Sequence, residues 1–166
     1  MTIDAASLPP VLDASKSATD VPVDLNELLK QEVAAGEVYR LAAAHGGPER
    51  SAHAYRGVMT QIQEEHELAA DAIRQLMADS QSQPAERSGT WGHWAPAVHR
   101  CSNAGADSQL PPLLECLLDG EQQLLETYLT GSAGLPEEVG KFMTGQLVPA
   151  QQRHVRMLRL LIGDAE

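Results

Sequence analysis

The chain has 166 residues, enough for one ordinary domain with its own core. It carries 12 Lys and Arg against 23 Asp and Glu, and this acidic balance argues against a nucleic-acid-binding surface and an anionic membrane face. Ala and Leu number 44 together, against 14 Val and Ile, which favours helix over sheet. Two cysteines make no disulfide framework, no apolar run approaches the roughly 20 residues of a membrane span, and no signal peptide is recognisable. We therefore expect an all-α, cytoplasmic protein.

The N-terminal half predicts a tail and a helical hairpin. Residues 1–22 are rich in Ser, Thr, Asp and Pro and lack apolar periodicity, so we expect a disordered tail before a helical domain over 23–166. Asp24 and Glu27 have the spacing of a capping box and predict a first helix that ends near residue 44. Pro48 is placed to open a second helix that ends near residue 78.

The C-terminal half predicts a second hairpin. The pair Pro111–Pro112 opens a third helix, which ends near Thr130, and Pro136 opens a fourth, which ends near Gly163. Pro149 lies inside the fourth helix with Gly145 four residues before it, and this predicts a kink.

The connection between the hairpins, residues 79–109, is too long for a compact domain unless the chain must travel the length of a bundle. A four-helix bundle in which the second and third helices run parallel supplies that reason. We expect a short helix over about 95–103 inside this crossover, and we expect Trp91 and Trp94 to pin it onto the bundle.

The two hairpins resemble each other, which indicates an ancient duplication. Matching residues are separated by 89 positions before the turn of each hairpin and by 88 after it, and the one-residue change falls where a loop tolerates it. The matched pairs are Leu28 and Leu117, Leu29 and Leu118, Glu32 and Glu121, Glu37 and Glu126, Tyr39 and Tyr128, Gly46 and Gly134, Pro48 and Pro136, Glu49 and Glu137, Gln63 and Gln151, and His66 and His154. We interpret Tyr39 and Tyr128 as core aromatics whose hydroxyls reach the end of the bundle.

One ionisable residue interrupts the apolar stripe of each long helix. Glu32 and Glu121 take core positions in the first and third helices, and His66 and His154 take them in the second and fourth. A buried carboxylate is costly unless it is paired or binds a cation. The spacing predicts that all four side chains meet on the bundle axis.

Two hairpins, a long crossover and this Glu and His pattern resemble the ferritin-like superfamily, and in particular a bacterial ferritin-like family of unknown function. The resemblance covers about residues 24–163. It implies a ferritin-like four-helix bundle with Glu32, Glu121, His66 and His154 at metal-ligand positions, and an iron-related redox or stress role. The chain departs from the ferritin-like pattern at Gln63 and Gln151, where the superfamily places bridging carboxylates.

Charge counting favours one metal ion over two. Two carboxylates and two neutral imidazoles balance one divalent cation and leave a pair of cations undercompensated. Mixed nitrogen and oxygen ligands favour Fe²⁺ or Zn²⁺, and nothing in the sequence indicates an organic cofactor. Glu65 is a further carboxylate at the edge of the stripe, and Arg153 appears on what we interpret as a solvated basic edge.

A metal-free alternative remains open at this point. Each Glu can accept a hydrogen bond from the His of its own hairpin, and the network then specifies the register of the bundle. Such a protein would be a non-enzymatic structural or interaction module, with the N-terminal tail as the segment that binds a protein partner. The sequence leaves open whether the chain is an enzyme and whether it forms a homodimer.

Overall fold

The computed structural model describes residues 24–45, 51–79, 84, 91–103, 110–131 and 135–163. The described part is all-helical, as the composition predicts. The predicted tail, residues 1–22, and the predicted helix start at Pro48 lie outside the described residues. In chain order the elements are α1 (Leu25–His45), α2 (Ser51–Asp79), η1 (Gly92–Trp94), α3 (Ala95–Asn103), α4 (Leu110–Gly131), α5 (Glu137–Phe142), η2 (Met143–Leu147) and α6 (Val148–Gly163).

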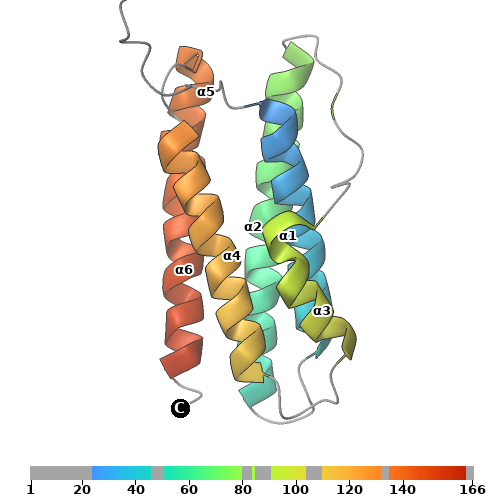
Figure 1. The fold of residues 1–166 in the computed structure, drawn as a ribbon. Coiled ribbons are helices and arrows are strands. Elements are labelled where there is room, and N and C mark those ends of the chain that lie inside the picture. Colours follow the sequence, from blue (N-terminus) through green and yellow to red (C-terminus); the bar gives the residue numbers. More distant parts are fainter. Residues whose placement is uncertain are drawn as a thin grey trace, which may run out of the picture.

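Two antiparallel hairpins stand side by side (Figure 1). One is α1 with α2, and the other is α4 with the continuous helical segment α5–η2–α6. Helices α2 and α4 run in the same direction, and α3 lies beside the α1–α2 hairpin (Figure 1). The predicted crossover helix over 95–103 is therefore confirmed, and the 3₁₀ turn η1 precedes it.

The start of α1 bears out half of the predicted capping box. The Asp24 side chain accepts a hydrogen bond from the backbone N–H of Asn26 at 2.9 Å, and this satisfies one of the free N–H groups of the first turn. Glu27 does not complete the box, because its carboxylate pairs with Lys30 instead.

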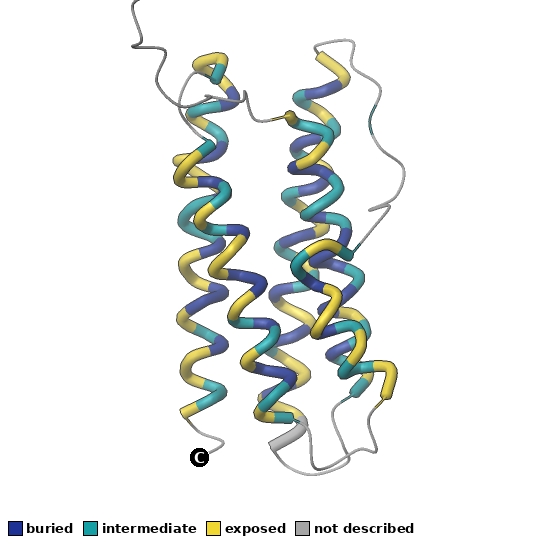
Figure 2. Tube along the Cα trace, in the orientation of Figure 1, coloured by how far each residue is buried: buried dark blue, intermediate teal, exposed yellow. Residues whose placement is uncertain are grey.

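The core runs along the facing sides of the long helices (Figure 2). On α1 and α4 its interior residues recur at the predicted steps of three and four, including Leu28 and Ala35 on α1 and Leu117 and Leu124 on α4. Within the described residues the buried polar and charged side chains are Glu32, His66, Glu121, Gln151 and His154. The interior is therefore apolar except around these five groups.

The π-helical turn η2 lies directly before Pro149, where the sequence predicts a kink. Pro149 has no N–H to donate, and the backbone N–H of Val148 bonds back five residues to Met143. The wider turn rotates the face that follows. Gln151 and Leu158 are buried, whereas Ala150 and Met157, which steps of four and three from His154 would place in the core, are half-buried.

Candidate metal centre

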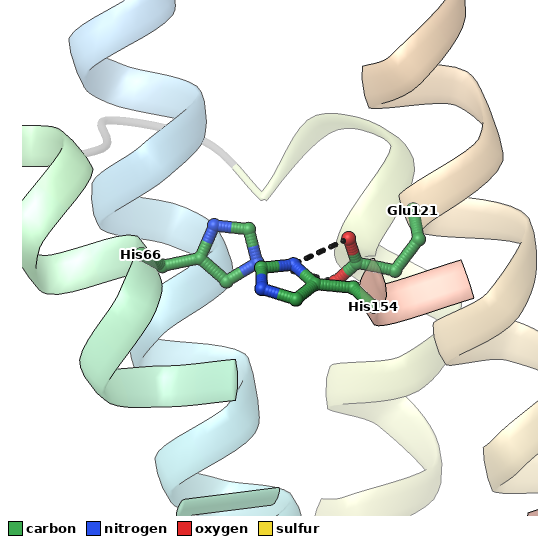
Figure 3. A group of neighbouring side chains, drawn as sticks. All are labelled: His66, Glu121 and His154. Atoms are coloured by element: carbon green, nitrogen blue, oxygen red, sulfur yellow. Dashed lines mark hydrogen bonds and ion pairs between the residues drawn. The ribbon is translucent and has the colours of Figure 1, made fainter. Parts of the chain in front are cut away.

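Four helices each contribute one of the predicted residues to a single buried cluster. Glu32 on α1, His66 on α2, Glu121 on α4 and His154 on α6 are each at most 1 % exposed. Figure 3 shows His66 and His154 from opposite hairpins converging on the Glu121 carboxylate. The predicted meeting of all four side chains is observed.

The side chains form a chain in which carboxylates and imidazoles alternate. Glu32 Oε2 lies 2.6 Å from His66 Nδ1, and His66 Nε2 lies 3.1 Å from Glu121 Oε1. Glu121 Oε2 lies 3.3 Å from His154 Nδ1. Each His thus contacts the Glu of its own hairpin, as the network interpretation expects, and the contact between His66 and Glu121 also joins the two hairpins.

Both ring nitrogens of both histidines face carboxylate oxygens, since His154 Nε2 lies 3.1 Å from Glu65 Oε2. A neutral imidazole has one N–H donor and one lone pair. Each neutral ring would therefore direct a lone pair at a negative oxygen, which is repulsive unless a proton or a cation lies between them. The group of His66, Glu121 and His154 could therefore hold a metal ion in place of a proton.

The electrostatics of the cluster favour charged groups despite burial. Burial alone would lower the pKa of His66, but the charges and hydrogen bonds of Glu121 and Glu32 outweigh it and raise the pKa to about 10. Burial alone would raise the pKa of Glu121, but the charge of His66 and the hydrogen bonds from both histidines lower it to about 2. Without metal, a proton therefore holds His66 between two carboxylates at neutral pH.

Three of the four residues are spaced to share one cation. Ligand atoms of His66, Glu121 and His154 lie within 4.8 Å of one another. Two ligands about 2.1 Å from one ion are about 3.0 Å apart at a right angle and about 3.4 Å apart at the tetrahedral angle. The two gaps at Glu121, 3.1 and 3.3 Å, are of this size, but they end on different oxygens, Oε1 and Oε2, so that one ion would be held by both oxygens of this carboxylate. From the 4.8 Å limit, two imidazole nitrogens would have to close by up to about 0.6 Å to lie opposite each other on the ion and by up to about 1.4 Å to lie at the tetrahedral angle.

Glu32 has a different place from the one that the resemblance implies. Its 2.6 Å contact with His66 Nδ1 is a hydrogen-bond distance and is shorter than the separation of two ligands on one ion. Glu32 is therefore placed behind His66, where it can accept the N–H of a ring whose Nε2 faces the centre. Carboxylates in this position orient histidine ligands and raise their basicity.

The two glutamines that replace the expected carboxylates lie in different surroundings. The side chain of Gln151 is buried, and its Nε2 donates to the carbonyl oxygen of Glu121 at 3.0 Å and also to the Glu121 carboxylate. Gln63 is half-buried and donates to Glu67 at 2.8 Å, outside the cluster. Gln151 therefore holds Glu121 in place, whereas Gln63 takes no part.

Glu65 and Arg153, which the sequence pattern places at the edge of the apolar stripe, contact the cluster. Glu65 contacts His154 and accepts a hydrogen bond from Arg153 Nη2 at 2.7 Å. The side chain of Arg153 is 47 % exposed, as the solvated basic edge predicts, and its guanidinium also pairs across the two hairpins. The repeat contained a usable signal, because Glu65 and Arg153 are 88 positions apart, the same separation as His66 and His154.

Aromatic rings close one side of the cluster. The ring of Tyr39 stacks on His66, with centroids 5.6 Å apart, and the edge of Trp94 meets both rings at 6.0 and 6.3 Å. A Cβ atom on Gly120 would overlap the six-membered ring of Trp94, so a glycine lets the crossover pack beside Glu121. The expectation that Trp94 pins the crossover is confirmed.

The prediction that Tyr39 and Tyr128 are core aromatics is confirmed, since both side chains are fully buried. The Tyr39 and Tyr128 hydroxyls are buried and have no hydrogen-bond partner among the described residues. Burial first, and then the charge of Glu121, raise the pKa of Tyr39 well above its usual value. The Tyr39 hydroxyl therefore stays protonated, and its ring covers one side of the cluster.

The chain has no match among family models, curated proteins or solved structures. None of the described helices combines the length and apolar character needed to cross a membrane.

Proposed function

We propose that the chain is a ferritin-like helical bundle that binds one divalent metal ion, Fe²⁺ or Zn²⁺, through His66, His154 and Glu121. The observation that carries the proposal is the direction of the imidazole nitrogens. Each ring presents one nitrogen to Glu121 and the other to an outer carboxylate, Glu32 or Glu65. This is the arrangement in which neutral histidines bind a cation with their remaining N–H groups satisfied.

The net charge of the cluster supports one ion rather than two. Glu32, Glu121 and Glu65 supply three negative charges and Arg153 supplies one positive charge. One divalent cation with neutral histidines brings the total to zero, and a second cation would leave two uncompensated positive charges in a site of low dielectric.

Three protein ligands leave coordination positions open. Closed structural sites of zinc use four protein ligands, whereas two histidines with one carboxylate and open positions are typical of catalytic Zn²⁺ and of non-haem Fe²⁺ centres. This ligand set supports a role in which a small molecule exchanges at the ion, including the redox or stress-related role that the family resemblance implies.

The test is metal analysis of protein purified without a metal-affinity tag, followed by titration of the metal-free protein with Fe²⁺ under anaerobic conditions and with Zn²⁺. We expect about one ion per chain and a rise in the unfolding midpoint that follows occupancy. Glu121→Ala should abolish both effects, whereas Glu126→Ala, an exposed carboxylate on the same helix, should change neither. If the metal-free protein gains no stability from either ion, the cluster is a hydrogen-bonded network and the chain is a metal-free module.

A further inference from the structure

Glu65 and Arg153 extend the buried cluster to the surface of the molecule. The side chain of His154 is 2 % exposed, that of Glu65 is 21 % exposed and that of Arg153 is 47 % exposed. Glu65 and Arg153, together with Leu68, Phe142 and Leu147, line an open groove of about 320 Å³ between α2 and the segment α5–η2–α6. The contact between Glu65 and His154 therefore links the groove to the centre.

The contact with Glu65 sets which nitrogen of His154 carries the proton and which presents a lone pair to Glu121. A neutral imidazole can carry its proton on either nitrogen. When Glu65 accepts the Nε2–H at 3.1 Å, the lone pair is left on Nδ1, which lies 3.3 Å from Glu121 Oε2. The same contact fixes the rotation of the ring about its bond to Cβ.

Glu65 is itself held by two further side chains. Its Oε1 accepts a hydrogen bond from Gln61 Nε2 at 3.1 Å, and its Oε2 accepts one from Arg153 Nη2 at 2.7 Å. Both carboxylate oxygens of a partly exposed glutamate are thereby engaged. Arg153 meets Glu65 and lies one residue before His154 on α6, so it connects the two helices that must keep His154 and Glu65 in register.

On the assumption that the proposed metal site exists, we propose that Glu65 is a positioning residue that orients His154 toward the ion, and that Arg153 acts on the ion only through Glu65. Carboxylates behind a histidine ligand change metal affinity by about 10- to 100-fold when they are removed. If Arg153 acted directly on the ion, its removal would strengthen metal binding, because a guanidinium repels a cation. If Arg153 acts by holding Glu65, its removal weakens metal binding. The two explanations therefore predict opposite signs for the loss of Arg153.

The experiment is a Zn²⁺ competition titration of the full chain against a chelating indicator, with Glu65→Ala, Arg153→Ala and the double variant. We expect Glu65→Ala to weaken Zn²⁺ binding by about 10- to 100-fold and Arg153→Ala to weaken it by a smaller factor. In the double variant we expect no loss of Zn²⁺ affinity beyond that of Glu65→Ala, because Arg153 has no effect on the ion once Glu65 is absent.

Matched controls come from the same helices. Glu64→Ala and Arg156→Ala remove the same charges from exposed neighbours and should leave affinity within about twofold, because salt screens such charges. Glu65→Gln should lose less affinity than Glu65→Ala, since the amide oxygen still accepts the Nε2–H. The visible absorption spectrum of bound Co²⁺ should shift in Glu65→Ala, because it reports the orientation of the ligand ring and would not respond to a change in stability alone.

Two results would overturn this inference while leaving the metal site intact. One is a wild type that binds Zn²⁺ and a Glu65→Ala variant that binds it equally well with the same Co²⁺ spectrum. The other is tighter binding by Arg153→Ala, which would show that its charge acts directly on the ion. A wild type that binds no Zn²⁺ would instead refute the proposed function.

Discussion

Metal binding at His66 must displace a proton, and the structure sets the size of that competition. Glu121 and Glu32 raise the pKa of His66 to about 10, and only the deprotonated Nε2 can bind a cation. At pH 7 the proton is favoured by about three pKa units, which weakens the apparent affinity about a thousandfold, or about 4 kcal/mol. We therefore expect the affinity to rise about tenfold per pH unit from neutral pH toward pH 10, with release of one proton per ion.

The stability of the metal-free fold should fall as the pH rises toward 10, whereas the affinity for metal rises. The raised pKa of His66 stabilises the fold fully below the unfolded value of 6.5, and this stabilisation is lost as the pH rises through about 10. The lowered pKa of Glu121 stabilises the fold above 4.5, and this contribution is lost as the pH falls toward about 2. The stabilisation given by added metal should therefore grow with pH in the range where the metal-free fold weakens.

The assay is a chelator-competition titration with Zn²⁺ at pH 6.5, 7.5 and 8.5, with proton release followed by a pH indicator in weak buffer. We expect about a hundredfold gain in affinity across this range. His99→Gln removes an exposed histidine of α3 and should give the same slope as the wild type. A flat pH profile without proton release would refute the reasoning, because it would mean that the ion does not replace the proton of His66.

Four further predictions follow from packing and charge. Gly120→Ala should lower the free energy of unfolding by about 1 to 3 kcal/mol, because the added Cβ would overlap the Trp94 ring. Gly57→Ala, where a Cβ meets no neighbouring atom, should raise the free energy of unfolding by up to about 1 kcal/mol. Chemical denaturation measures both changes. In the metal-free protein, His66→Ala should cost on the order of 3 kcal/mol because it leaves buried carboxylates unpaired, and replacement of the whole buried cluster by Leu and Met should cost less; additive costs would contradict the coupling. Gln151→Glu should lower the thermal midpoint of the metal-free protein and enlarge the rise that added Zn²⁺ gives over that of the wild type, because it removes a donor to a buried carboxylate and adds a negative charge. Gln63→Glu should change neither quantity, because that side chain lies outside the cluster.

Much of the fold could be predicted because local signals and burial agree. Helices α1 and α4 bury the residues that the steps of three and four select, and the ends of α1, α3 and α4 fall within one or two residues of their predicted positions. The convergence of His66 and Glu121 could be predicted for the same reason, since each interrupts an otherwise apolar face. A polar residue at such a position has to find a partner inside the bundle.

The remaining features depend on local geometry that a helical wheel with 3.6 residues per turn does not represent. The π-helical turn η2 rotates the following face, so Gln151 enters the core where the sequence places Ala150. The sequence also could not show that Glu32 contacts only the outer nitrogen of His66 and stays outside the group that could share a cation, because that depends on a difference of half an ångström between two contacts. Glu65 and Arg153 were underestimated because each is partly exposed, and periodicity reports only burial.

The repeat is broken at the positions that set the charge of the site. The helices α2 and α6 carry equivalent Gln and His residues, but at the position directly before each histidine one helix has Glu65 and the other has Arg153. A second glutamate at this position would give four carboxylates, which balance two divalent cations. The arginine instead neutralises Glu65 at 2.7 Å and leaves two net negative charges for one cation. The matching residues of the two hairpins therefore bring two histidines to one carboxylate, and the single exchange of charge supports the capacity of one ion that we propose.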